Sequence, residues 1–272
     1  MKQTWAGLLL AGAVVATLVG CASTTQGGAV GANRKQLMLL SSDQVDAMAA
    51  KAYSDTLQQA QAKKVLNTDA PQVRRVRAIA ARLIPQVSVF RTDALNWKWE
   101  VNVIDSPELN AWCMQGGKIA VYTGIIDKLK LTDAELAGIM GHEMAHALRE
   151  HSREQLSRSM ATQLSVSVGA AFLGLGQLGA DLINQGAGLM VNLPNSRDAE
   201  TEADRMGVEL AARAGYDPRA AVAVWQKMIK AGNGQQPPEW LSTHPSHDRR
   251  IEDLTRYAQV VIPMYEKAKR GG

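Results

Sequence analysis

Three of the five histidines in this chain fall within one short stretch, GHEMAHALREH (141–151). His142 and His146 are four residues apart, so on a helix their side chains share one face and can hold one cation through two imidazole nitrogens. Glu143 is rotated by about 100° around such a helix, which keeps it near the cation but makes it a poor third ligand. A carboxylate in this position can take a proton from metal-bound water. The alternative is a solvated helix face that carries ordinary histidines.

A pair of acidic residues further along the chain could complete the site. The HExxH spacing is typical of zinc peptidases, and a catalytic zinc needs a third protein ligand and an open fourth position. Glu200 and Asp204 lie four apart in a predicted amphipathic helix, RDAETEADRMGVELAARAG (197–215). Glu200 can bind the metal, and Asp204 can accept a hydrogen bond from the outer nitrogen of a zinc histidine. Glu202 is a rival ligand, but it points about 160° away from the Glu200 face. These acidic residues could instead only complement the helix dipole.

The surrounding segments predict the elements that position these residues. Thr132 to Glu135 form a capping box with Thr132 as the N-cap, and the helix that it opens is predicted to run through GHEMAHALREHSREQL (141–156). Before it, WKWEVNVI (97–104) alternates like a strand, and AWCM (111–114) and KIAVYTG (118–124) predict a hairpin. After Thr132 the pattern is mostly helical. We therefore expect an α+β fold that is mostly helical, with a small antiparallel sheet beside the HExxH helix.

The N-terminal residues predict an export signal. MKQTWAGLLLAGAVVATLVGC (1–21) has one Lys, an apolar run and small residues before Cys21, which is the layout of a secretory signal. Leu18 to Cys21 also resembles a bacterial lipobox, which implies cleavage before Cys21 and lipidation of that residue. Ala22, rather than Asp, follows, and the same resemblance then implies an outer membrane lipoprotein that faces the periplasm. A plain signal peptide or a single anchoring helix are the alternatives.

Composition divides the chain into three parts. We expect a lipoprotein-type signal peptide over 1–20, a lipidated Ser/Thr/Gly/Gln-rich tether over 21–40, and a folded domain over 41–272. The formal charge of +4 is small and unclustered, which argues against nucleic acid as a partner. Cys113 is the one cysteine besides Cys21, so with Cys21 acylated no intrachain disulfide can form.

Some segments outside the candidate site have more than one interpretation. Residues 164–193 are apolar and rich in Gly, Ala and Ser; they could be a buried helix pair, a mobile lid or a membrane-facing surface. His151 is five residues past His146 and is interpreted as a surface or helix-end residue, off the metal face. The last helix is predicted to begin near Ser246 and to reach the C-terminus.

Segments on both sides of the HExxH helix resemble those of one family. NAWCMQGGKIAVYTGII, NSRDAETEADRMGVELAARAGYDP and STHPSHDRRI resemble segments of the family-forty-eight zinc metallopeptidases, the group of HtpX, the CAAX prenyl protease, BepA and LoiP. The matched segments follow the family order and cover roughly residues 95–255. HExxH followed by a distant ExxxD is the gluzincin pattern. The resemblance implies that residues 41–272 form a zincin-like (gluzincin) metallopeptidase domain with one Zn²⁺ per chain.

The resemblance also implies roles for the candidate metal-site residues. Glu143 matches the general base, and Asp204 matches the carboxylate behind the ligands. His244 matches a histidine near the metal that contacts the transition state or caps the zinc. The matching zinc ligands are His142, His146 and Glu200.

A further part of the resemblance concerns the substrate. Arg250 matches the family arginine that follows His244, and we expect it among the substrate-binding residues. Trp112, Cys113 and Gln115 depart from the family pattern, which leaves the shapes of the substrate subsites open. The edge strand along which a peptide would lie consists of Asn110, Ala111, Trp112, Cys113 and Met114.

The sequence therefore predicts a zinc-dependent endopeptidase of the bacterial cell envelope that acts on unfolded or misassembled proteins, with Glu143 as general base. Its partners would be polypeptide substrates and the membrane, the latter through a lipid anchor at Cys21. One alternative is a periplasmic chaperone or assembly factor with a latent or capped zinc site. Another is a metal-binding lipoprotein without catalysis, in which Glu143→Gln would have no effect.

Overall fold

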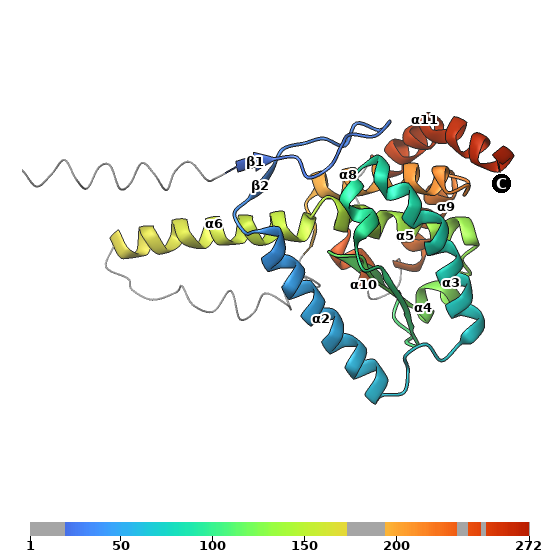
Figure 1. Ribbon diagram of the computed structural model, residues 1–272, viewed down its shortest axis with the longest axis horizontal. Coiled ribbons are helices and arrows are strands. Elements are labelled where there is room, and N and C mark those ends of the chain that lie inside the picture. The colour runs from blue at the N-terminus through green and yellow to red at the C-terminus, as the bar shows by residue number, and fades with distance from the viewer. Residues whose placement is uncertain (1–19, 173–193, 233–238, 246–248, 272) are drawn as a thin grey trace, which may run out of the picture.

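The structure is a computed structural model of the whole chain, and it describes residues 20–172, 194–232, 239–245 and 249–271 (Figure 1). The predicted alternatives for residues 164–193 lie largely outside the described residues, as does the predicted helix start near Ser246. Among the described residues, no helix combines the length and the apolar character that crossing a membrane requires.

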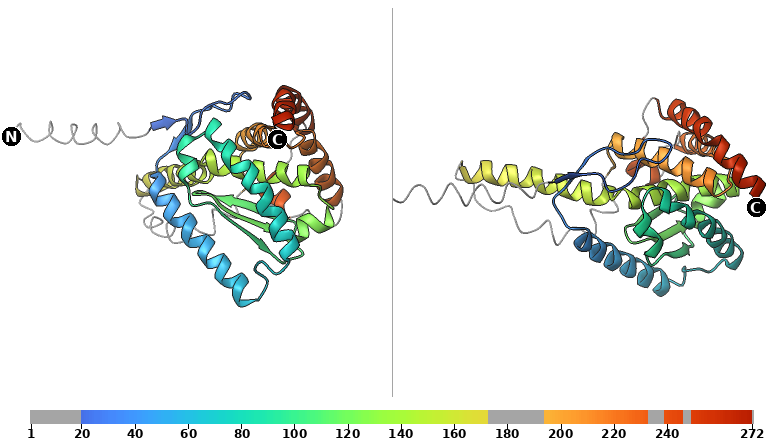
Figure 2. Two further views of the ribbon diagram at one scale, coloured as in Figure 1. Left: turned by 45° about the vertical axis from the view of Figure 1, so that its right-hand side comes forward. Right: turned by 45° about the horizontal axis from the view of Figure 1, so that its top comes forward.

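Helices make up most of the described chain, as predicted, and they surround one small sheet (Figures 1 and 2). Thr132 caps the central helix α5 through the expected capping box with Glu135. The described α-helices are α2 (Ser42–Ala62), α3 (Ala70–Leu83), α4 (Thr123–Lys128), α5 (Asp133–Leu148), α6 (His151–Phe172), α8 (Arg197–Arg213), α9 (Ala220–Gly232), α10 (Glu239–Thr243) and α11 (Arg250–Gly271), and two 3-10 helices are η1 (Ile84–Val89) and η2 (Thr92–Asn96).

The sheet beside α5 is mixed, and the prediction of an antiparallel sheet was wrong for one strand. Strands β3 (Glu100–Ile104), β4 (Ala111–Met114) and β5 (Lys118–Tyr122) lie in the order β3-β5-β4. The expected hairpin pairs β4 with β5 in antiparallel fashion, whereas β3 pairs with the other side of β5 and runs parallel to it. Strand direction depends on which neighbour a strand chooses, and the alternation of side chains carries no such information. Strand β4 is consequently an edge strand that faces α5.

Helices α5 and α8 approach each other closely because both carry a glycine at the crossing. A Cβ atom on Gly141 would lie 2.8 Å from the carbonyl oxygen of Gly207, and one on Gly207 would lie 2.7 Å from the amide nitrogen of His142. A side chain at either position would therefore push the helices apart. This contact brings the acidic start of α8 against the histidines of α5.

The chain between α5 and α6 breaks where the sequence predicts a continuous helix. Helix α5 ends at Leu148, and Glu150 has φ 51°, a left-handed conformation that is uncommon for a residue other than glycine. Helix α6 then starts at His151. The position of His151 relative to α5 is therefore different from the one that helical periodicity gives.

Residues 23–38, here called the strap, pack on the domain, so the prediction of a tether was wrong for this segment. Its C-terminal end, β2 (Gln36–Met38), pairs with β1 (Gly20–Ala22). Ala32 is 1% exposed and Gln36 is fully buried. The strap is polar in composition, but its polar groups bond to the domain; the amide of Gln36, for example, donates to the carbonyl oxygen of Arg149 at 2.7 Å.

Candidate metal centre

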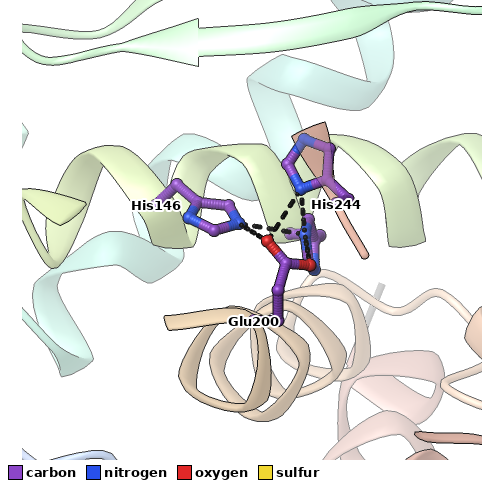
Figure 3. A group of neighbouring side chains, drawn as sticks. His146, Glu200 and His244 are labelled. Carbon is purple, nitrogen blue, oxygen red and sulfur yellow. Dashed lines mark hydrogen bonds and ion pairs between the residues drawn. The ribbon is translucent and has the colours of Figure 1, made fainter. Parts of the chain in front are cut away.

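Four buried side chains from three parts of the chain converge on one point. His142 and His146 extend from the same face of α5. Glu200 extends from the first turn of α8, and His244, which follows α10, points toward Glu200 and His146 (Figure 3). Each of the four offers one ligand atom, and these atoms all lie within 4.8 Å of one another. The group could hold one metal ion.

The separations between the candidate ligand atoms fit a zinc ion. Nε2 of His142 lies 3.1 Å from Nε2 of His146, and Oε1 of Glu200 lies 3.2 Å from Nε2 of His146 and 3.0 Å from Nδ1 of His244. Ligands bound tetrahedrally at zinc distances of about 2.0–2.1 Å are separated from one another by about 3.3 Å. Imidazole nitrogens and a carboxylate oxygen are also the donor types that zinc takes in catalytic sites.

The protonation states of the group favour metal binding at two positions and oppose it at a third. Burial lowers the pKa of His146 well below its ordinary value, so this imidazole is neutral. Burial alone would raise the pKa of Glu200, but the neighbouring histidines hold it well below the usual range, so it is a carboxylate. Burial alone would lower the pKa of His142, yet its bonds to Asp204 and Glu200 raise it to about 9. A metal ion must displace that proton.

Asp204 and Arg250 lie behind the metal group. Oδ1 of Asp204 is 3.0 Å from Nδ1 of His142, the contact expected from the four-residue spacing. Nη1 of Arg250 forms an ion pair with Oε2 of Glu200 at 2.7 Å, and Nη2 donates a hydrogen bond to Oδ1 of Asp204 at 2.8 Å. The prediction that Arg250 binds substrate was wrong, because its side chain is fully buried on the far side of the carboxylates and stacks on Trp225.

A cleft runs past the metal group on its exposed side. Glu143 lies in its wall, with Oε1 3.4 Å from Nε2 of His244. The backbone amide and the side-chain amide of Asn195 both donate to the carbonyl oxygen of Thr243, which holds the segment before His244 against the start of α8. The cleft is lined by Asn110, Ala111, Trp112, Cys113, Met114, Glu143, His146, Ser152, Asn195, Thr243 and His244.

Five of the predicted substrate residues thus line this cleft, namely Asn110 and the four residues of the edge strand β4. Trp112 is half-buried and meets the ring of Tyr53 edge to face, with ring centroids 5.7 Å apart. Cys113 is 8% exposed, and burial raises the pKa of its thiol well above the usual value. This thiol stays protonated, so it is a packed residue and not a nucleophile.

His151 is part of the site, and the interpretation of this residue as a surface histidine was wrong. Its side chain is 3% exposed, with Nδ1 2.8 Å from Nδ1 of His146. Its Nε2 lies 3.2 Å from Oε2 of Glu202, the residue considered above as a rival ligand. The left-handed residue Glu150 separates α5 from α6, so the side chain of His151 does not occupy the position that an uninterrupted α5 would give it. Only the unusual density of histidines in the stretch 142–151 pointed to it in the sequence.

The profile of Peptidase family M48 matches residues 70–258, so the chain belongs to this family and the resemblance drawn from its motifs is confirmed. Mitochondrial metalloendopeptidase OMA1 of Arabidopsis thaliana is 41% identical over 175 residues, which are 64% of this chain and 35% of that protein. OMA1 of Schizosaccharomyces pombe is 34% identical over 227 residues, 83% of this chain and 64% of that protein. The beta-barrel assembly-enhancing protease of Escherichia coli is 26% identical over 204 residues, 70% of this chain and 39% of that protein.

These comparisons also correct the predicted localisation. The expected outer membrane lipoprotein facing the periplasm is wrong by this comparison, because the OMA1 relatives are mitochondrial enzymes. The lipobox resemblance is a short local pattern, whereas the OMA1 similarity extends over most of the chain. The chain spans between 35% and 64% of the length of the OMA1 relatives given above.

Proposed function

We propose that the protein is a zinc-dependent endopeptidase that hydrolyses peptide bonds in unfolded or misassembled proteins and so serves protein quality control. The observation that carries this proposal is the placement of Glu143. Its carboxylate lies beside the metal group and in the wall of the same cleft that the edge strand β4 lines. A purely structural metal site would gain nothing from a carboxylate in that position.

The residues of the chain divide the chemistry between them. Zinc, when bound, polarises a carbonyl group and lowers the pKa of water toward about 7. Glu143 takes the proton of the attacking water and delivers it to the leaving amine. An extended peptide can add to the free edge of β4, where backbone bonds give affinity and side-chain pockets give selectivity. This binding mode requires an extended chain, which favours unfolded or flexible substrates.

The test is cleavage of an unstructured protein such as casein by the wild-type protein and by Glu143→Gln, at equal zinc content. Glu and Gln are nearly the same size, so this substitution removes the base and leaves the ligands in place. We expect cleavage by the wild type and its loss in the variant. Equal cleavage by both proteins would exclude Glu143 as the base and the proposed mechanism with it.

His244 supports a second candidate, a protein with a latent metal site that acts as a chaperone or assembly factor. Its Nδ1 lies 3.0 Å from Glu200 and 3.2 Å from Nε2 of His142, within the ligand group itself. A histidine there can take the fourth position that a catalytic zinc keeps open. The same residue could instead stabilise the oxyanion of the transition state from its Nε2 side.

His244→Ala separates these two roles. If His244 occupies the fourth position, the substitution opens the site and increases cleavage by the zinc-loaded protein. If His244 stabilises the transition state, the substitution lowers kcat. The chaperone function would be favoured if the zinc-loaded wild-type protein cleaved no substrate, and if the wild type and Glu143→Gln prevented the aggregation of an unfolded protein equally well.

A further inference from the structure

The outer nitrogens of the two α5 histidines have different partners. Nδ1 of His142 meets a carboxylate directly, at 3.0 Å from Oδ1 of Asp204. Nδ1 of His146 meets another imidazole, at 2.8 Å from Nδ1 of His151. His151 is itself bonded to a carboxylate, with Nε2 3.2 Å from Oε2 of Glu202. One candidate ligand is therefore held directly, and the other is held through an interposed histidine.

The protons in this chain of contacts have one consistent arrangement. A histidine that gives the lone pair of Nε2 to a metal carries its hydrogen on Nδ1. Nδ1 of His146 therefore donates, and Nδ1 of His151 must accept. The hydrogen of a neutral His151 then lies on Nε2, which faces Glu202 and donates to it. When Nε2 of His146 binds a metal, the hydrogen bonds can therefore run in one direction only, from His146 to His151 and from His151 to Glu202.

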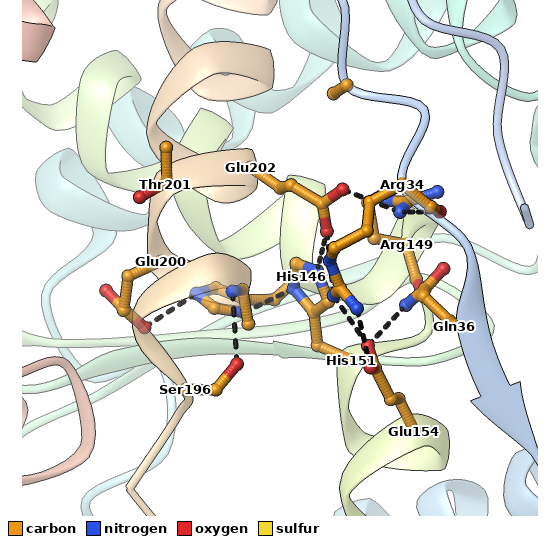
Figure 4. A network of polar contacts seen from close by, with 12 residues as sticks. Arg34, Gln36, His146, Arg149, His151, Glu154, Ser196, Glu200, Thr201 and Glu202 are labelled. Atoms are coloured by element: carbon orange, nitrogen blue, oxygen red, sulfur yellow. Dashed lines mark hydrogen bonds and ion pairs between the residues drawn. The ribbon is translucent and has the colours of Figure 1, made fainter.

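Glu202 is in turn held by two guanidinium groups (Figure 4). Nη2 of Arg149 donates to its Oε1 at 2.7 Å, and Nη2 of Arg34 donates to its Oε2 at 3.1 Å. Arg149 is fully buried, and Arg34 belongs to the strap. Arg34 also forms a two-point contact with Glu154 on α6, at 2.7 and 2.8 Å. Both oxygens of Glu202 are therefore satisfied, and the carboxylate has little freedom to turn.

The members of this series come from four separate elements. His146 lies on α5, His151 begins α6, Glu202 lies on α8 and Arg34 lies on the strap. His151 is 3% exposed and Glu202 is 5% exposed, so water competes little for these bonds. Because these hydrogen bonds join four elements, they hold His146 rigidly only when all four elements are packed in place.

We propose that His151 is a positioning residue for His146: anchored by Glu202, it holds the ring of His146 in the tautomer and orientation that aim Nε2 at the metal. Arg34 connects this anchor to the strap, so docking of the strap supports the metal site. The inference rests on the metal site of the proposed function but not on peptidase activity. His151 is not itself a candidate ligand, and it contacts the ligand group through His146, so its effect passes through that residue.

The test is zinc affinity, measured by competition with a chelator, together with the absorption spectrum of the cobalt-loaded protein. His151→Phe keeps a buried ring but removes both hydrogen bonds. Loss of such a partner behind a ligand typically weakens metal binding by about 10–100-fold. We expect a loss in that range and a changed cobalt spectrum. His151→Gln, whose amide can accept from His146 and donate to Glu202, should recover most of the affinity.

Arg158→Met is the matched control. Arg158 also lies on α6 and bonds to Glu154, but it is on the outer side of the network and its side chain is 56% exposed. This variant should bind zinc like the wild type. Unfolding of each metal-free variant is measured in parallel, so that a loss of fold is recognised as such. His151→Phe with wild-type affinity and an unchanged cobalt spectrum would refute the positioning role.

A second variant covers the case in which His151→Phe does not fold. Glu202→Gln keeps the size of the anchor and removes its charge, and we expect weaker zinc binding and an altered cobalt spectrum. Wild-type behaviour of this variant would also overturn the proposal. The outcome is separate from that of the Glu143 experiment: a protein without peptidase activity can still show the loss of affinity, and an active one can lack it.

Discussion

Arg250→Met should strongly destabilise the metal-free protein, because Arg250 and the protonated His142 together neutralise two buried carboxylates. Its guanidinium lies 2.7 Å from Oε2 of Glu200 and 2.8 Å from Oδ1 of Asp204. The group is fully buried and lies 3.5 Å from the ring centroid of Trp225. Methionine keeps the unbranched aliphatic part of the side chain, so the substitution removes the charge together with the stacking of the guanidinium on Trp225.

The magnitude follows from the burial of both partners. Removal of one partner of a buried ion pair costs about 3–5 kcal/mol, since the other partner stays buried without compensation. For a domain of this size class, 1 kcal/mol corresponds to roughly 2–4 °C in Tm, so we expect a decrease of about 6–20 °C. Zinc supplies positive charge to Glu200 and thereby replaces part of what Arg250 provides. The increase in Tm on adding zinc should consequently be larger for the variant than for the wild type.

The assay is thermal unfolding followed by circular dichroism, after removal of metal with a chelator and again with zinc added. Arg256→Met is the control on the same helix; Arg256 pairs with Asp253, but its side chain is 64% exposed. Its Tm should match that of the wild type, because exposed pairs contribute little. A metal-free Arg250→Met protein with the Tm of the wild type would refute the reasoning, since it would mean that the two buried carboxylates do not need the charge of Arg250 in addition to that of His142.

Two further predictions concern the strap. Gly28→Ala should release the strap from the domain, because Gly28 has φ 59° and a Cβ atom there would lie 2.3 Å from Phe90 and 2.7 Å from Glu209. Faster proteolytic cleavage within residues 23–38 would show the release, and an unchanged cleavage rate would contradict it. Burial alone would raise the pKa of Glu154, but its bonds, chiefly to Arg34, lower it from 4.5 to about 2. The stability from this group is present above pH 4.5 and is lost as the pH falls toward 2. Urea midpoints across that window should fall less for Glu154→Gln, and equal slopes for both proteins would refute the assignment.

The candidate ligands could be predicted because most of the information about them is local. Helical periodicity places His142 beside His146, and a capping signal fixes the helix that carries them. Spacing also placed Asp204 one turn after Glu200, and the structure brings it to the outer nitrogen of a histidine as expected. The approach of α8 and of the segment with His244 to α5 is non-local, and there the family resemblance supported the choice of residues. The catalytic roles of these residues remain predictions.

Two of the errors arose where local pattern is a poor guide. The helix breaks at Glu150 although no glycine or proline lies there, so helical periodicity placed His151 away from the metal group. The strap has the composition of a linker, yet Arg34 finds its carboxylate partner Glu154 in an element 120 residues further along the chain. Polar residues with such distant partners cannot be distinguished from solvated ones in a single sequence, because burial depends on the partner and not on composition.

Helix α8 shows how these distant contacts combine. Its acidic residues Glu200 and Asp204 lie one turn apart and face the metal group. Glu202 and Glu209 are seven residues apart, so they share the opposite face, and they bind the strap through Arg34 and the amide of Ala29. The alternative that these acids only complement the helix dipole does not account for partners on both faces. A rotation or a shift of α8 that broke the contacts with the strap would also move Glu200. The contacts between the strap and α8 therefore help to hold Glu200 in place at the metal group.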